Sequence, residues 1–397
     1  IVDSLKTPLT LGFDWGHQFF NNQFLFSGQY AQSKIDTFSG QGIMLHFAKI
    51  GGRHWNFSLD ADLRDKNFNI DALGFLDRNN VNSYYMGHSY FTTDPIWKFQ
   101  ETSTNLNMWN QESPEEIISK EKLVLSSGLS LGTSVTMLNQ WSFGLDISKK
   151  LSGYDDVDTR RYGDLGFVIE DPGTISISSW IAPKPGKKVN QQLSIFGGKD
   201  DYASKWHGLS YNLELSPREH YSISIAPDYA WNYDESQFLY SSAALFPDDP
   251  DSTSLYGALT SQTISIGIRS NYSFTPDMSL QLFVQPFVAI GKYDKYGFLN
   301  KSKTYPFYGS NASSSWTAEE ALDYGLDQNF NLKSLNLQSV FRWEYRPGSV
   351  FFLVWSFSSA DNESLPGEFD ISGSFKNLFD QVATHKFLIK YNYWMKL

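Results

Sequence analysis

One short segment of the sequence fits a known catalytic pattern. Gly128-Leu129-Ser130-Leu131-Gly132 matches the G-x-S-x-G pattern of hydrolases that use a serine nucleophile. That pattern needs a sharp turn between a strand and a helix, because the turn exposes the serine hydroxyl. Here the segment lies inside a run in which apolar and small polar residues alternate, which is typical of a strand. We therefore interpret it as part of a β-strand.

The histidines do not have the spacing of a metal site. None of them forms an H-x-x-x-H pair. We expect no enzyme activity and no cofactor, and we keep a membrane-embedded hydrolase, assembled from distant Ser, His and acidic residues, as a remote alternative. The seven histidines are His17, His46, His54, His88, His207, His220 and His385.

Two acidic runs are weak candidates for binding Ca²⁺. Carboxylate oxygens suit this ion, but neither run follows the EF-hand loop pattern. We favour solvated surface loops, with cations that bridge lipopolysaccharide as the alternative. The candidate residues are Asp155, Asp156, Asp158, Asp248, Asp249 and Asp251.

The segment from residue 341 to 355 indicates a different kind of functional residue. Aromatic residues alternate there with charged ones, so the two kinds of side chain point to opposite faces of a strand. Pro347-Gly348 then reverses the chain. The segment around Arg269 alternates in the same way. We predict that Arg269, Arg342, Glu344 and Arg346 line a polar lumen, whereas Phe341, Trp343, Ile264 and Ile266 face lipid.

Period-two alternation recurs along the whole chain and predicts about seventeen strands. Most of them have ten residues or more, which is the length that tilted membrane-spanning strands need. The predicted strands are 9–20, 23–34, 41–50, 53–64, 81–93, 96–110, 121–138, 141–151, 173–183, 188–197, 203–216, 220–240, 255–274, 278–292, 333–346, 349–359 and 384–396.

The connections between these strands alternate in length. Every second one is a tight turn such as Asn21-Asn22 or Pro347-Gly348, and those between are mostly long, as at 65–80, 152–172 and 293–332. Short periplasmic turns and long extracellular loops are typical of outer-membrane barrels, whereas a soluble sandwich has no reason to sort its loops in this way. The sequence therefore predicts an all-β, antiparallel transmembrane barrel.

The composition agrees with this fold class. Aromatic residues make up 16% of the chain, yet the mean hydropathy is −0.36, as expected when one face of each strand meets lipid and the other meets water. The net charge of −11 argues against nucleic acid as a partner, because phosphate binding needs clustered Lys and Arg. The absence of cysteine excludes disulfides and thiolate metal sites.

The predicted strand directions do not allow the first and last strands to close the barrel. Both run toward the short-turn side, so they cannot pair with each other in antiparallel fashion. We expect 18 or more strands in the complete barrel, with the missing ones supplied upstream or by a second chain. Residues 1–397 would then be one barrel domain at the C-terminal part of a longer protein.

Several stretches together resemble one family. They are LGFDW (11–15), ALGFLDRNN (72–80), DTRRYGD (158–164), residues 268–297 and residues 341–355. The chain resembles an uncharacterised outer-membrane β-barrel domain, a domain of unknown function that usually follows a carbohydrate-binding family-9-like module in Gram-negative envelope proteins. The resemblance implies further strands and such a module upstream.

These observations lead to a functional expectation. We expect a passage or uptake barrel, or an export-associated pore, in the bacterial outer membrane. The alternative is a plugged structural or docking barrel that anchors an upstream carbohydrate-binding-like module. The expected partners are outer-membrane lipid, lipopolysaccharide and other envelope proteins.

Overall fold

The fold was analysed in a computed structural model of the chain. It describes residues 8–115, 121–157, 160, 167–186, 188–241, 254–299, 301–323, 327–363, 373 and 382–395. The predicted all-β class is confirmed, because strands account for most of the described residues and the helices are single short turns. No helix in this part of the chain is long and apolar enough to cross a membrane.

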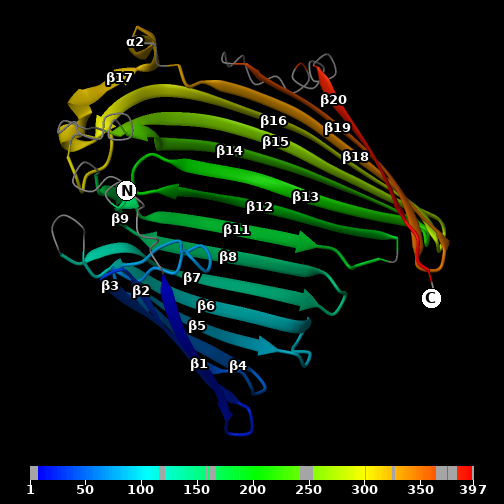
Figure 1. Cartoon of the computed structure of the whole chain (residues 1–397), viewed down its shortest axis with the longest axis horizontal. Coiled ribbons are helices and arrows are strands. Elements are labelled where there is room, and N and C mark those ends of the chain that lie inside the picture. The colour runs from blue at the N-terminus through cyan, green and yellow to red at the C-terminus, as the bar shows by residue number, and fades with distance from the viewer. Residues whose placement is uncertain are drawn as a thin grey trace.

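Eighteen strands form one large antiparallel sheet (Figure 1). Two three-residue strands, β9 (Gly153–Asp155) and β10 (Ile169–Asp171), form a separate small sheet. The strands of the large sheet are β1 (Leu9–Phe19), β2 (Phe24–Ile35), β3 (Phe38–Lys49), β4 (Trp55–Arg64), β5 (Val81–Thr92), β6 (Phe99–Ser113), β7 (Leu123–Met137), β8 (Ser142–Leu151), β11 (Thr174–Ala182), β12 (Val189–Asp200), β13 (Lys205–Arg218), β14 (Tyr221–Ser241), β15 (Ser254–Thr275), β16 (Met278–Leu299), β17 (Ser315–Thr317), β18 (Phe330–Arg346), β19 (Ser349–Glu363) and β20 (Ala383–Asn392).

The large sheet is a meander in which each long strand pairs with the next one along the chain. β8 pairs with β11, and β16 pairs with β18, while the short β17 pairs with the upper end of β16. Each of the seventeen predicted strands corresponds to one long strand of this sheet. The predicted two-residue hairpin at Pro347-Gly348 is also present, and Gly348 takes the positive φ of 77° that this turn requires.

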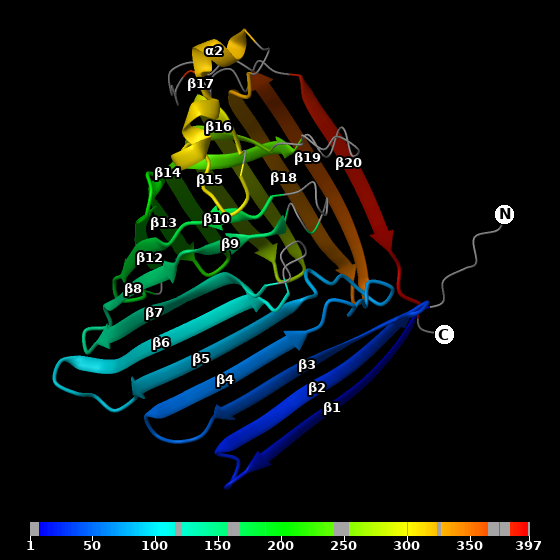
Figure 2. The ribbon, with the colours of Figure 1, turned by 90° about the vertical axis from the view of Figure 1, so that its left-hand side faces the viewer.

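The sheet curls strongly but does not close by itself. In Figure 2, β1–β3 lie at one end of the curl and β18–β20 at the other. No pairing joins β1 to β20 within the described ranges, so the sheet is open between these two edges. This agrees with the expectation that the first and last strands do not pair in antiparallel fashion.

Two faces of opposite character result from the register. Residues directly opposite each other on neighbouring strands share a face. Phe47, Leu59, Met86, Met108 and Leu129 follow one another across five strands, and we call their side the apolar face. The adjacent row lies on the other side of the sheet and includes His46, Asp60, Tyr85 and Trp109. We call this side the polar face.

The apolar face is left uncovered by the chain. Ile177 is 51% exposed, Ile195 is 55% exposed and Leu131 is 47% exposed, although each lies in the middle of a strand. A soluble two-sheet sandwich would bury such residues in a dry core. The described part of the chain provides no second layer over them. The buried hydrophobic clusters lie instead at the long-loop end, around Leu255, Val168 and Leu299.

Several strands are longer at this end than the sequence predicted. β16 continues to Leu299 instead of residue 292, and β6 continues to Ser113 instead of 110. The extended part of β16 is held by β17 and by the packing of Tyr293 and Tyr296 against Ala321 of α2 (Ala318–Leu322). Tertiary contacts therefore extend strands that local alternation would end.

Candidate functional site

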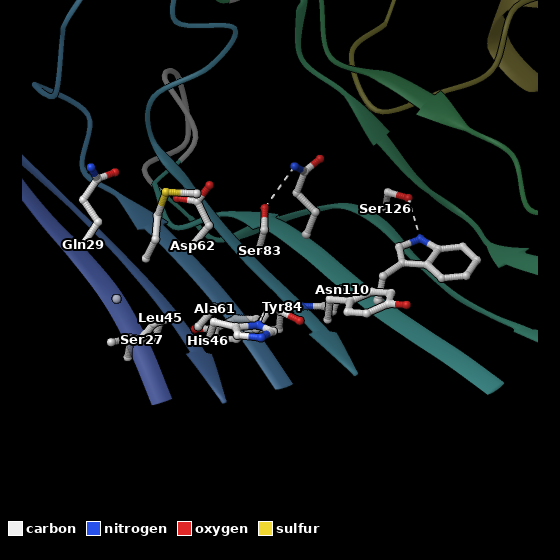
Figure 3. A pocket seen from close by; sticks show the side chains of 16 residues that line it. Ser27, Gln29, Leu45, His46, Ala61, Asp62, Ser83, Tyr84, Asn110 and Ser126 are labelled. Carbon is white, nitrogen blue, oxygen red and sulfur yellow. Dashed lines mark hydrogen bonds and ion pairs between the residues drawn. The ribbon is translucent and has the colours of Figure 1, made fainter. Parts of the chain in front are cut away.

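The polar face carries a hollow of about 580 Å³ over strands β2 to β7. Gln29 of β2, Asp62 of β4 and Ser83 of β5 project on the same side of the sheet (Figure 3). A second hollow of about 590 Å³ lies beside the first and shares His46 and Tyr85 with it. The two together follow the wall from β2 to β8 and combine polar with apolar lining residues.

A hydrogen-bonded network holds the side chains of this surface. The Tyr85 hydroxyl donates to Oδ1 of Asn107 at 2.7 Å, and the Ser89 hydroxyl donates to Oδ1 of Asn105 at 2.7 Å. The Trp109 indole N–H donates to Ser126 Oγ at 3.2 Å. These pairs join β5, β6 and β7, and they present amide, hydroxyl and aromatic groups that suit a polar solute or ordered water.

His46 and Asp60 form the closest contact between titratable groups in the hollow. Their Nδ1 and Oδ1 atoms are 2.5 Å apart, and both side chains are about one-third exposed. Ser27 lies directly opposite His46 on β2, so the three residues follow in the order Ser–His–Asp across three strands. Among the described contacts no hydrogen bond joins Ser27 to His46, which is the contact that activates a serine nucleophile. The row therefore has the composition of a triad without its essential link.

Three of the four predicted lumen residues, Arg269, Arg342 and Glu344, lie on the polar face, whereas Arg346 follows a register shift at the end of β18. Arg342 donates to Glu344 at 2.7 Å, and Glu344 also accepts the backbone N–H of Gly348 at 3.0 Å. Arg346 donates to the Tyr393 hydroxyl at 2.8 Å, while the Arg269 guanidinium lies 5.1 Å from the centre of the Phe283 ring. Phe341, Trp343, Ile264 and Ile266 are on the opposite, apolar face. That the polar face lines an aqueous lumen remains a prediction.

The candidate Ca²⁺ ligands are not brought together. Asp156 accepts hydrogen bonds from two arginines, and the Asp155 carboxylate accepts the backbone N–H of Val157. Asp158, Asp248, Asp249 and Asp251 lie outside the described residues. In the part of the chain that the structure describes, no group of three or more His, Asp or Glu side chains is arranged to hold a metal ion.

A segment whose contacts the sequence did not predict crosses the long-loop end of the sheet (Figure 2). We call residues 153–157, 160 and 167–171 the bridging segment. Val168 packs against Val81, Leu123 and Leu125 on one wall. Its neighbours Phe167 and Ile169 pack against a cluster that includes Leu299 on the other wall. The segment thus contacts β5 and β7 as well as β15 and β16.

Polar contacts fasten the bridging segment at both of its ends. Arg78 donates to both carboxylate oxygens of Asp156, at 2.8 and 2.6 Å, and the two side chains are only 11% and 4% exposed. Lys150 donates to Asp171 at 2.6 Å. The backbone N–H of Lys303 donates to the Val168 carbonyl at 2.6 Å. Such contacts join residues far apart in the sequence, so alternation within one strand does not reveal them.

A tyrosine cluster supports the same segment from the side. The Tyr202 hydroxyl donates to Glu170 at 2.9 Å, and its ring stacks on Tyr305 with the centroids 4.0 Å apart. Burial, followed by the adjacent Glu170 carboxylate, raises the pKa of Tyr202 to about 12. Tyr305 itself is almost completely buried, with 3% of its surface exposed.

Comparison with known proteins assigns a family but no activity. No curated protein and no solved structure matches the chain. The chain matches, over residues 10–397, the family described as Domain of unknown function (DUF5916), and it belongs to that family.

Proposed function

We propose that the chain forms the wall of a β-barrel in the bacterial outer membrane and that this barrel lets polar solutes pass. The observation that carries the proposal is the pair of faces on one long meander, apolar on one side and polar on the other. Short turns at one end and long connections at the other support the same orientation, with the short turns in the periplasm.

The exposed apolar face supports insertion in a bilayer. Its residues remain uncovered in the middle of the strands, where a lipid environment would remove them from water. Along this face, Trp343 lies opposite Phe351, and Phe351 lies opposite Tyr391. These large aromatic residues are close to the short turns, where outer-membrane barrels carry an aromatic girdle.

The open edges of the sheet set a condition on this barrel. Both β1 and β20 run toward the short-turn end, and an antiparallel barrel can join them only through an odd number of further strands. Edges left open in hydrocarbon would cost several kcal/mol for each unsatisfied backbone group. We therefore propose that additional strands, from the same polypeptide or from a second chain, fill the gap.

The alternative is a docking barrel that is kept shut. The bridging segment favours it, because this segment joins two walls across the long-loop end. The hollows over β2–β7 favour passage. Their exposed amides and carboxylates would cost free energy if a packed interior buried them without hydrogen-bond partners. We regard the bridging segment as a constriction within a passage.

Single-channel recording on the full-length protein in planar bilayers tests the proposal. A passage barrel gives ion-conducting steps of uniform size in KCl. A protein that inserts, as shown by heat-modifiable migration and protease protection, yet gives no conductance would overturn passage in favour of docking. A protein that remains soluble and does not enter vesicles would overturn the membrane barrel itself.

A further inference from the structure

Charged side chains on the polar face are sorted by sign around the sheet. From β1 to β14 the face is mainly acidic, and from β15 to β20 it is mainly basic. The acidic residues of the first arc include Asp14, Asp60, Asp62, Glu101, Asp146, Glu214 and Asp228. The basic residues of the second arc are Arg269, Arg342, Lys386 and Lys390.

The register shows where the sign changes. Glu214 on β13 lies opposite Ser224, and Ser224 lies opposite Arg269 on β15. The same cross-strand row continues through Phe283, Gln338 and Ser356 and ends at Lys386 on β20. One row across the polar face thus passes from an acidic residue to two basic ones, with no charge between them.

The few residues of opposite sign within each arc are held in ion pairs. In the acidic arc, Arg64 binds Asp62 at 2.5 Å and Asp77 at 2.9 Å, and Lys150 binds Asp171 at 2.6 Å. In the basic arc, Glu344 binds Arg342 at 2.7 Å. By contrast Asp14, Asp146, Asp228, Arg269 and Lys386 have exposed side chains. The charges that remain exposed are therefore sorted by sign more completely than the full set of charged residues on the polar face.

The curl of the sheet places the two arcs across from each other. In Figures 1 and 2, β1–β5 lie on one side of the interior and β16–β20 on the other. Most of these charged residues lie in the half of their strand that is nearer to the short turns. An acidic wall that faces a basic wall gives an electric field directed across the interior, which low-dielectric walls strengthen.

We propose that this transverse field makes the barrel selective for small dipolar solutes, those with a cationic and an anionic group held apart, such as zwitterionic amino acids and short peptides. A solute of this class turns its ammonium group to the acidic arc and its carboxylate to the basic arc. An uncharged solute of equal size gains neither contact. The inference rests on the proposed passage function and adds the substrate class.

The same field determines how the barrel selects between simple cations and anions. Cations pass along the acidic arc and anions along the basic arc, so the intact barrel separates K⁺ from Cl⁻ weakly. When the charges of one arc are removed, the charges of the other arc alone determine the ion selectivity. Neutralising the basic arc therefore produces cation selectivity, and neutralising the acidic arc produces anion selectivity.

The test uses the full-length protein in proteoliposomes and planar bilayers. Its probes are glycylglycine, which is zwitterionic, and N-acetylglycinamide, which is uncharged and of similar size. One variant neutralises the basic arc (R269Q, K386Q and K390Q), and a matched variant neutralises the acidic arc (D14N, D146N and D228N). A control variant carries K34Q, which lies on the apolar face, and E319Q, which lies in α2.

We expect glycylglycine to enter about five-fold faster than N-acetylglycinamide, which corresponds to ~1 kcal/mol, the size of one ion contact in water. Each arc variant should bring this ratio near one, and the two should shift the K⁺/Cl⁻ reversal potential in opposite directions, while the control behaves as the wild type. Equal entry of both probes into wild-type vesicles, or arc variants that shift the potential in the same direction, would overturn the inference while leaving passage intact. Entry of neither probe would overturn the proposed passage function.

Discussion

Arg78 and Asp156 are 78 residues apart in the sequence, and the guanidinium of the first donates to both carboxylate oxygens of the second. The pair ties the bridging segment to the loop before β5, close to Val81 and Val168, which pack together. Asp156 is also bonded by Arg160, so its buried charge is compensated from two sides. This contact is the principal polar anchor of the segment across the long-loop end.

The first prediction concerns that anchor. Arg78→Gln leaves the buried Asp156 with weaker compensation, and removing one partner of a buried ion pair costs roughly 3–5 kcal/mol. We expect the bridging segment to open more often and the single-channel conductance to rise. Arg53→Gln is the matched control, because the Arg53–Asp94 pair is 74% and 61% exposed and lies at a short turn. Equal conductance in the two variants would show that the segment does not constrict the path.

The second prediction concerns the two faces of β18. Trp343 lies on the apolar face and Arg342 on the polar face. An arginine on the lipid side costs roughly 2–4 kcal/mol at the midplane and about 0–1 kcal/mol near the interface, and Trp343 lies close to a short turn. Trp343→Arg should therefore lower the yield of assembled protein in the outer-membrane fraction more than Arg342→Trp does. Equal yields from the two variants would count against the assignment of the faces.

Much of the fold is predictable because strand alternation is a local property. The register of Phe341, Arg342 and Trp343 follows from their own order, and Gly348 marks its turn by itself. The extension of β16 to Leu299 was missed, since it depends on contacts with residues more than fifteen positions away. The bridging role of Val168 was missed for the same reason, because its partners come from β5 and β7.

In the candidate site, too, local alternation predicts some features, and others depend on contacts between strands. Alternation assigned Arg269 and Arg342 to one face, but it did not show that a single row leads from Arg269 to Lys386. It also did not bring Ser27, His46 and Asp60 into one row, because that row depends on the register of three strands. Registers depend on turn lengths and bulges that are known only once the strands are paired.

The third prediction concerns pH and the loop between β4 and β5. Burial acts to raise the pKa of Asp77, but hydrogen bonds from Arg64 and from the backbone N–H of Arg78 outweigh it and hold the pKa below its usual value. A depressed pKa in the folded state gives stability that is present above the unfolded pKa of 3.8 and is lost as the pH falls through the lower folded value.

We therefore expect the amide protection factors of residues 72–80, which correct the measured rates for intrinsic exchange at each pH, to fall below about pH 3.8 and to stay constant from pH 5 to 8. Asp77→Asn removes the titrating group, so the protection factors of its loop should stay at one lower level throughout this range. A wild-type loop whose protection is the same at pH 3 and pH 6 would contradict this account.

The fourth prediction concerns the amide and hydroxyl network of the hollow. Tyr85→Phe removes the donor to Asn107, whereas Tyr84→Phe alters the apolar face. A single hydrogen bond contributes roughly 0.5–1.5 kcal/mol, so both variants should assemble. We expect only Tyr85→Phe to change the entry rate of polar solutes into proteoliposomes. The same rate in both variants would show that this part of the wall does not contact the solute.

The most direct test of the central claim is cysteine accessibility along β15. These 397 residues contain no cysteine, so each substitution introduces the single thiol of this chain, and the unsubstituted protein gives the background labelling. Thr263→Cys and Ser265→Cys place thiols on the polar face, and Ile264→Cys and Ile266→Cys place them on the apolar face. In native outer membranes, a membrane-impermeant charged thiol reagent should label only the first two, and a lipid-soluble maleimide should label the second two. Equal labelling at all four positions, or protection of all four from both reagents, would contradict a barrel wall with water on one side and lipid on the other.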